Sequence, residues 1–259
     1  MDEALGDSAT VLRKLNRALA GDLADSQELW QRLLDLQLAL GMRDDALVTA
    51  QKIAQRFPSN DALERVANLQ LARGDARAAL ATLQSAPPPE PAKASAYWMR
   101  LAGLAFEIGE VATERRAYEN LVKLPGAAQW QYQRLWELAP DRAAALAIAL
   151  QAFERYESEQ MFYAALSIYR EDENEPELLA LLERAEQYAG VRSRADYWQT
   201  RIGLHQQRAS RALQSKDFAL AKREHSRAAT LLERAERRVT FEPKLRAALV
   251  AAQNSQLLS

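Results

Sequence analysis

The stretch that decides the fold runs from residue 27 to residue 58 and reads QELWQRLLDLQLALGMRDDALVTAQKIAQRFP. Apolar residues recur at the three- and four-residue spacing of an amphipathic helix, with Trp30 and Leu33 on one face. Gly41 ends this first helix, and Pro58 follows the end of a second one. The stretch therefore predicts two helices joined by a tight turn.

The composition of the whole chain favours helices throughout. The chain has 259 residues, of which 48% are hydrophobic and 27% charged. Ala, Leu, Arg, Glu and Gln dominate, and these are strong helix formers. The chain has no Cys, which excludes disulfides and thiolate metal sites. It also has no apolar run of about 18 residues that could span a membrane. The acidic N-terminus does not read as a secretory signal, and we expect the chain to be a piece of a longer protein.

The first helix pair is followed by further copies. Gly41 is followed 33 residues later by Gly74, and Pro58 by Pro91. In the next copy a Trp again precedes a Gly by 11 residues. This order of a large residue, small packing residues, a turn glycine and a closing proline resembles the tetratricopeptide repeat (TPR). The motifs are clear in residues 27–125 and weaker up to residue 240.

The resemblance implies an all-α, right-handed superhelical solenoid of about six TPR-like helix pairs, the last pair elongated. We expect residues 1–259 to form a single solenoid. Its predicted segments are an orphan helix of a preceding repeat (8–22), repeats at 27–59, 60–94, 95–126, 127–157 and 158–190, a long helical hairpin (191–240) and a terminal helix (243–254). The second helix of repeat 158–190 is expected to end at Gly190.

The first helix of each pair lines the concave groove in the family that the sequence resembles, and this assigns candidate partner-binding residues. An aromatic run with flanking arginines is typical of a peptide or partner-helix site. If the register of the repeats slips, the same aromatics belong to the core between repeats. The predicted groove residues are Met99, Phe106, Trp130, Arg134, Phe162, Tyr169 and Arg170.

Motifs for catalysis and cofactor binding are missing. The sequence contains no phosphate-binding loop, nucleophile elbow or catalytic carboxylate pair, so we expect neither an enzyme nor a cofactor. His205 and His225 lie on the two arms of the predicted hairpin, but a zinc site needs further ligands, so we expect no metal. These histidines read as ordinary polar or partly buried residues.

Charge is distributed unevenly along the chain. Residues 191–259 carry 14 Lys and Arg against 6 Asp and Glu, whereas the preceding 190 residues carry 20 against 29. This difference is compatible either with chance variation on a solenoid surface or with differently charged partners at the two ends. Basic residues of the hairpin lack the aromatic side chains that stack on bases, so we expect no nucleic-acid partner. They are Arg223, Arg227, Arg234, Arg237 and Arg238.

The resemblance implies a non-catalytic scaffold for protein–protein interaction. Ala/Leu/Arg-rich, cysteine-free arrays of degenerate repeats are similar to the periplasmic portions of bacterial exopolysaccharide export proteins of the Pel, alginate and cellulose type. That likeness predicts a periplasmic location, a polysaccharide deacetylase or hydrolase as partner, a role in biofilm formation, and membrane contact only through an outer-membrane domain elsewhere. Two alternatives stay open: a cytoplasmic adaptor or co-chaperone that binds a peptide, and direct polysaccharide binding in the groove.

Overall fold

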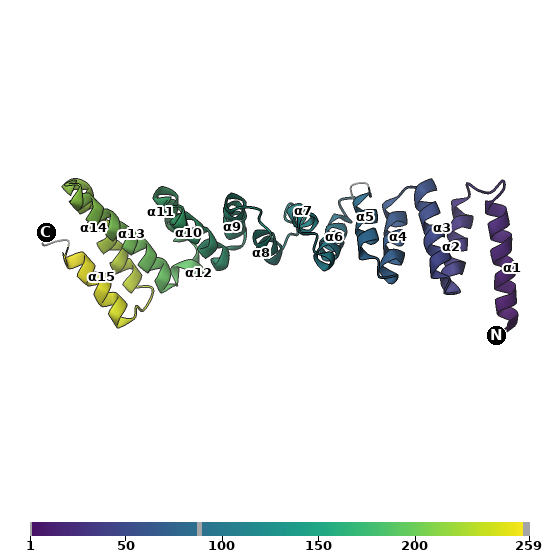
Figure 1. The fold of residues 1–259 in the computed structure, drawn as a ribbon. Coiled ribbons are helices and arrows are strands. Elements are labelled where there is room, and N and C mark those ends of the chain that lie inside the picture. Colours follow the sequence, from purple (N-terminus) through teal and green to yellow (C-terminus); the bar gives the residue numbers. More distant parts are fainter. Residues whose placement is uncertain (1, 87–89, 256–259) are drawn as a thin grey trace. The chain divides into compact units, whose positions relative to one another are not determined.

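The computed structural model describes residues 2–86 and 90–255, and every regular element in that part of the chain is an α-helix (Figure 1). The predicted all-α solenoid of helix pairs is therefore confirmed. In chain order the helices are α1 (Asp2–Leu19), α2 (Gln27–Ala39), α3 (Arg43–Arg56), α4 (Asn60–Ala72), α5 (Ala76–Gln84), α6 (Ala94–Ile108), α7 (Val111–Leu121), α8 (Gln129–Glu137), α9 (Arg142–Tyr156), α10 (Glu159–Glu171), α11 (Glu175–Ala185), α12 (Ala189–Arg192), α13 (Ala195–Gln214), α14 (Phe218–Glu236) and α15 (Pro243–Ser255).

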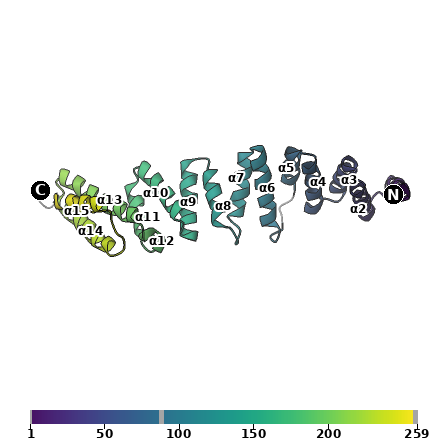
Figure 2. The same ribbon diagram turned by 90° about the horizontal axis from the view of Figure 1, so that it is seen from below.

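The chain divides into two compact units, Met1–Leu138 with α1 to α8 and Ala139–Ser259 with α9 to α15. Within each unit, most helices that follow one another in sequence pack side by side, and α11 packs against α13 beyond the short α12 (Figures 1 and 2). We call them unit 1 and unit 2. The prediction of one continuous solenoid over residues 1–259 stays a prediction, and residues 1, 87–89 and 256–259 of it lie outside the described residues.

A left-handed residue turns the chain between the two helices of a pair. Gly41 after α2 has φ 71°, and Gly74 and Gly109 after α4 and α6 have φ 81° and 76°. In each case the next residue donates its backbone N–H to a carbonyl five positions back, for example Met42 to Gln37 at 2.9 Å. This hydrogen bond satisfies a carbonyl that the helix end would otherwise leave unpaired.

Unit 2 makes the same turn without glycine. Glu173 after α10 and Lys216 after α13 have φ 53° and 61°. Asn174 and Asp217 donate the corresponding hydrogen bonds, at 3.0 and 2.8 Å. A side chain in this region is strained by the contact of its Cβ with the backbone, so these two turns cost free energy that the glycine turns do not.

A buried tyrosine connects each of three first helices, α6, α8 and α13, to the second helix of an earlier pair, α5, α7 and α11. Its ring fills the space between helices, and its hydroxyl satisfies a carbonyl at or near the C-terminal end of that preceding helix, a bond that contributes about 1 kcal/mol. The three bonds join Tyr97 to the Leu83 carbonyl at 2.9 Å, Tyr132 to the Val122 carbonyl at 3.2 Å, and Tyr197 to the Leu182 carbonyl at 2.9 Å.

The end of repeat 158–190 differs from the prediction. α11 ends at Ala185, and Gly190 lies inside the short helix α12. Positive-φ glycines in the described chain are Gly41, Gly74 and Gly109, so Gly190 is not a left-handed helix cap. It allows close packing instead, because a Cβ added there would lie 2.9 Å from a carboxylate oxygen of Glu159. The expectation that Gly190 ends the second helix was wrong.

We predict that Lys216→Gly stabilises unit 2. The substitution removes the strain of a left-handed lysine, and after the added flexibility of the unfolded chain the gain is about 0.5–1 kcal/mol. The measurement is urea unfolding followed by circular dichroism. The converse control is Gly74→Ala, which meets no atom within 4 Å but keeps φ positive, and should cost about 1 kcal/mol. A lower unfolding midpoint for Lys216→Gly would contradict this account of the turn.

Candidate functional site

The predicted groove of unit 1 is an exposed surface made by consecutive first helices. Arg100 of α6 donates a hydrogen bond to Asn68 of α4, and the Gln131 Nε2 of α8 lies 3.6 Å from the Met99 Sδ of α6. Both pairs are 32 residues apart, about one repeat, so α4, α6 and α8 lie in a row on this surface. This separation is close to the predicted repeat of 33 residues.

Phe106 is the most exposed large hydrophobic residue of this row, with 63% of its surface accessible. The guanidinium carbon of Arg134 lies 5.3 Å from its ring centre, a cation–π contact between α6 and α8. We use the name α6–α8 face for the surface formed by Met99, Gly103, Phe106, Trp130, Arg134 and Glu137. The Phe106 ring is thus held at the surface rather than buried.

Two carboxylates hold Arg134 in this position. Its Nε and Nη2 donate to the two oxygens of Glu114 at 2.8 and 3.2 Å, and its Nη1 donates to Glu137 at 2.9 Å. The Glu114 side chain is 4% exposed and the Arg134 side chain 31%. The hydrogen bonds that Arg134 donates, first to Glu114 and then to Glu137, raise the pKa of Arg134. A bidentate pair of this kind fixes the plane of the guanidinium over Phe106.

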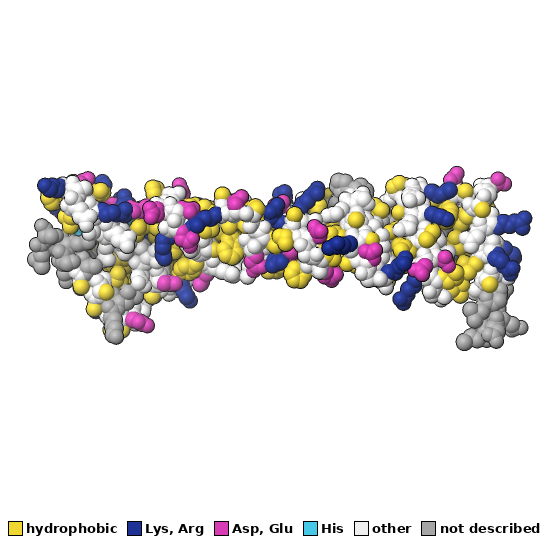
Figure 3. Space-filling view, viewed as in Figure 1, with side chains coloured by type: hydrophobic (Ala, Val, Ile, Leu, Met, Phe, Trp, Pro, Cys, Tyr) yellow, Lys and Arg dark blue, Asp and Glu magenta, His cyan; other side chains and the backbone are white. Residues whose placement is uncertain are grey.

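Trp130 adds a second exposed ring at the start of α8. It is 49% exposed and meets the ring of Tyr118 edge to face, with 6.0 Å between ring centres. Met99 is half-buried beneath the same surface. Figure 3 shows one side of the molecule, where hydrophobic side chains alternate with charged ones of both signs. On the α6–α8 face, apolar contact area and fixed charge are combined, as in protein-binding surfaces.

The unit 2 part of the predicted groove is different. Phe162 is 0% exposed and Tyr169 is 7% exposed, whereas Arg170 is exposed. The Phe162 ring lies 5.3 Å from that of Phe153 on α9 and 6.2 Å from that of Tyr197 on α13. These two aromatics of α10 belong to the core, so unit 2 presents only Arg170 of the predicted set on its surface.

The helical spacing carried the signal for this burial. Phe162, Ala165, Leu166 and Tyr169 follow the i, i+3, i+4, i+7 pattern of the stripe that a helix turns toward the core. The same pattern in α7 joins Glu114 to Ala117, Tyr118 and Leu121. A carboxylate inside an apolar stripe indicates a buried ion pair. The position of Glu114 in the sequence could therefore have identified it as the partner of a basic residue, which the structure shows to be Arg134.

One histidine of the hairpin, His205, faces a carboxylate. His205 Nδ1 lies 2.7 Å from Glu224 Oε2, and both side chains are almost fully buried. Glu224 also accepts a hydrogen bond from Arg227 at 3.0 Å and lies 3.7 Å from Arg208. Among the described residues, no group of three His, Asp or Glu side chains could hold a metal ion.

Burial alone would raise the pKa of Glu224, but its surroundings outweigh burial. The hydrogen bond from His205 and the charges of Arg208, His205 and Arg227 lower the pKa of this carboxyl below its ordinary value of 4.5. Glu186 of unit 2, which pairs with both Arg201 and Arg234, also has a pKa below its ordinary value. There burial is outweighed by a hydrogen bond from Arg201 and by neighbouring arginine charges.

No helix in the described part of the chain has the length and apolar character that crossing a membrane requires. A family model described as tetratricopeptide repeat matches residues 52–235 of the chain. The comparison with curated proteins gives no match.

Several solved structures are similar in fold. A tetratricopeptide repeat protein from Parabacteroides merdae has 14% identity and a TM-score of 0.40, with 96% of this chain and 93% of that one covered. The TPR domain of P58(IPK) has 14% identity and a TM-score of 0.37, covering 98% and 74%. YrrB, described as a TPR protein with an unusual peptide-binding site, has 12% identity and a TM-score of 0.37, covering 67% and 91%. At these values the likeness concerns the fold alone.

We predict that Arg134→Met destabilises unit 1 by about 1–3 kcal/mol, because it leaves the buried Glu114 carboxylate without its bidentate donor. Urea unfolding measures the loss. The double variant Glu114→Gln/Arg134→Met should recover most of it, since no buried charge then remains. Equal destabilisation in the single and double variants would show that packing of the Arg134 stem, not the ion pair, is what matters.

We also predict that unit 2 loses stability in acid through Glu224. Because the folded-state pKa of Glu224 is lowered, its stabilisation is fully present above pH 4.5 and is lost as the pH falls through the folded value. Glu224→Gln should therefore flatten the fall in melting temperature between neutral pH and about pH 3. Glu233→Gln, an exposed change of equal charge on the same helix, should leave the wild-type slope.

Proposed function

The chain belongs to the tetratricopeptide repeat family, and from this we propose that it is a non-catalytic scaffold that binds a partner protein through the α6–α8 face. The observation that carries the proposal is the exposed Phe106 ring held under Arg134. Exposing a large ring to water is unfavourable, and here a fixed ion pair keeps it presented. Aromatic and arginine side chains of this kind are the residues that contribute most to protein–protein binding.

The face suits a partner that supplies an apolar anchor with neighbouring polar groups. Phe106 and Trp130 offer contact area without much loss of side-chain entropy, because each ring has few rotatable bonds. Glu137 and Arg134 bring charge of both signs to the rim. Since Arg134 is already oriented by Glu114, little ordering is needed when a partner binds.

We further propose that the partner is a periplasmic polysaccharide deacetylase or hydrolase of a bacterial exopolysaccharide export system. Support comes from the sequence resemblance described above: an Ala/Leu/Arg-rich array without Cys, whose repeats become degenerate along the chain. The proposal places the chain in the periplasm, because enzymes that modify an exported polymer act there. A cytoplasmic peptide-binding adaptor is the alternative.

Direct binding of polysaccharide is a second candidate, favoured by the exposed Trp130 ring. Flat aromatic rings at a surface can stack on sugar rings as well as on side chains. Fluorescence of the chain titrated with polymer and, separately, with partner protein distinguishes the two. The variant Trp130→Phe identifies which part of the signal comes from this residue among the five tryptophans.

We predict that Phe106→Ala weakens partner binding at least about tenfold, in line with loss of a central aromatic contact. The measurement is biolayer interferometry with the whole chain immobilised and a purified exopolysaccharide deacetylase or hydrolase in solution. Val48→Ala is the matched control, because Val48 is 50% exposed but lies on α3. Failure of every such enzyme to bind the wild-type chain would refute the proposed partner, and equal weakening by both variants would refute the face.

A further inference from the structure

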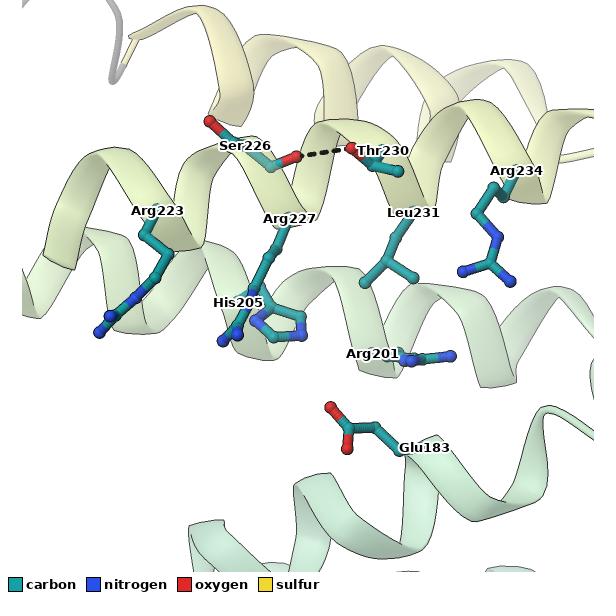
Figure 4. Close-up of a pocket in the computed structure, with 9 residues that line it drawn as sticks. All are labelled: Glu183, Arg201, His205, Arg223, Ser226, Arg227, Thr230, Leu231 and Arg234. Atoms are coloured by element: carbon teal, nitrogen blue, oxygen red, sulfur yellow. Dashed lines mark hydrogen bonds between the residues drawn. The ribbon is translucent and has the colours of Figure 1, made fainter.

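Unit 2 contains a cavity of about 420 Å³ between α11, α13 and α14, apart from the face proposed above (Figure 4). Four arginines line it, Arg201, Arg223, Arg227 and Arg234, together with His205 and one carboxylate, Glu183. We call this cavity the arginine pocket. Its lining has more guanidinium than carboxylate groups, so its charge favours an anionic occupant.

Arg201 forms the buried part of the arginine pocket. The residue is 7% exposed, and its Nη1 donates to Glu186 at 2.6 Å and to the Tyr197 hydroxyl at 2.9 Å. The Nε of Arg201 is also buried, and it has no hydrogen-bond acceptor among the described residues. A buried donor without an acceptor is costly, and an oxyanion in the pocket would supply one.

The two acids beside the pocket are shared among several cations. Glu224, whose side chain is 0% exposed, pairs with His205 and Arg227. Glu186 pairs with Arg201 and Arg234. Each guanidinium has five N–H donors, so one shared carboxylate leaves most of them unused. The nearest carboxylate oxygen to Arg223 that forms an ion pair lies at 4.0 Å.

Three of the arginines form a line on α14. Arg223, Arg227 and Arg234 are four and seven residues apart, spacings that keep them on one side of the helix. Figure 4 shows their side chains extending from α14 toward α13. Eleven residues of helix measure about 16 Å, the length of about five residues of extended peptide. The side chains are 63%, 54% and 44% exposed, so this line is accessible.

We propose that the arginine pocket binds an acidic peptide segment of a partner protein. Carboxylates spaced along an extended chain would lie over the line of arginines, and one of them would reach Arg201. Guanidinium groups bind carboxylates through paired, charge-assisted hydrogen bonds. Leu231 gives the pocket an apolar wall for the peptide's aliphatic atoms. The lining has no Phe, Tyr or Trp ring on which nucleic-acid bases could stack.

The test uses the whole chain and a fluorescein-labelled peptide containing five consecutive glutamates, with a five-glutamine peptide as the control probe. Fluorescence anisotropy should show binding of the glutamate probe about tenfold or more tighter than that of the glutamine probe, and weaker at high salt. No binding of the glutamate probe would overturn the proposal. Equal competition by inorganic phosphate and by unlabelled peptide would also overturn it, since it would show a site for small anions.

Arg223→Gln/Arg227→Gln should weaken the glutamate probe about tenfold or more. The matched control is Arg142→Gln/Arg184→Gln, which removes the same charge from exposed ion pairs of unit 2 outside the pocket and should change affinity by less than about twofold. Arg223→Gln alone guards against misfolding, because the Arg223 side chain is 63% exposed and its Nε lies 4.0 Å from the nearest oxygen of Glu224. It should weaken the probe while the melting temperature is unchanged. Equal weakening by the two double variants would overturn the proposal.

Discussion

The close approach of neighbouring helices is the constraint on which the rest of the structure depends. It is made possible by alanines without accessible surface in successive second helices: Ala46 in α3, Ala79 in α5, Ala117 in α7 and Ala149 in α9. A larger side chain at these positions would overpack the interface, at a cost of about 1–3 kcal/mol. Because the helices lie this close, residues about 32 positions apart come into contact, as Met99 and Gln131 do. The α6–α8 face exists because of that spacing.

The tight turn inside each pair is the second recurring feature, and it explains why the repeat pattern fades along the sequence. The hydrogen bond across the turn is the same after α2, α4, α6, α10 and α13. Glycine occupies the left-handed position in the first three of these turns, but Glu173 and Lys216 occupy it in the last two. The last two turns keep the same backbone geometry, although the glycine that would reveal them in the sequence is absent. A small strain of about 1 kcal/mol is tolerated because packing on both sides of the turn determines the backbone.

Both candidate binding regions are built around an acid placed in an apolar helical stripe. Glu114 orients Arg134 over Phe106, and Glu224 and Glu186 hold the arginines of the hairpin. A buried carboxylate is costly unless it is paired, so each of these acids requires the cations around it to keep their positions. The result is one oriented guanidinium beside exposed rings in unit 1 and a set of oriented guanidinium groups in unit 2. Orientation before binding reduces what a partner must order.

The sequence by itself determined the fold class, because helical periodicity, turn glycines and a 33-residue repeat are local signals that follow directly from helix geometry. It also predicted an outward position for Phe106 of α6, since Gly109 sets the register of that helix, and Phe106 is exposed. The spacing of Phe162 and Tyr169 along α10 is that of a buried stripe, but their neighbours were decided by tertiary structure: the Phe162 ring lies against Phe153 of α9 and Tyr197 of α13. The arginine pocket also depends on tertiary structure, because the side chains that line it come from three helices. The physical reason is that sequence spacing describes one helix at a time, whereas the depth of a side chain depends on the volume that its neighbours leave.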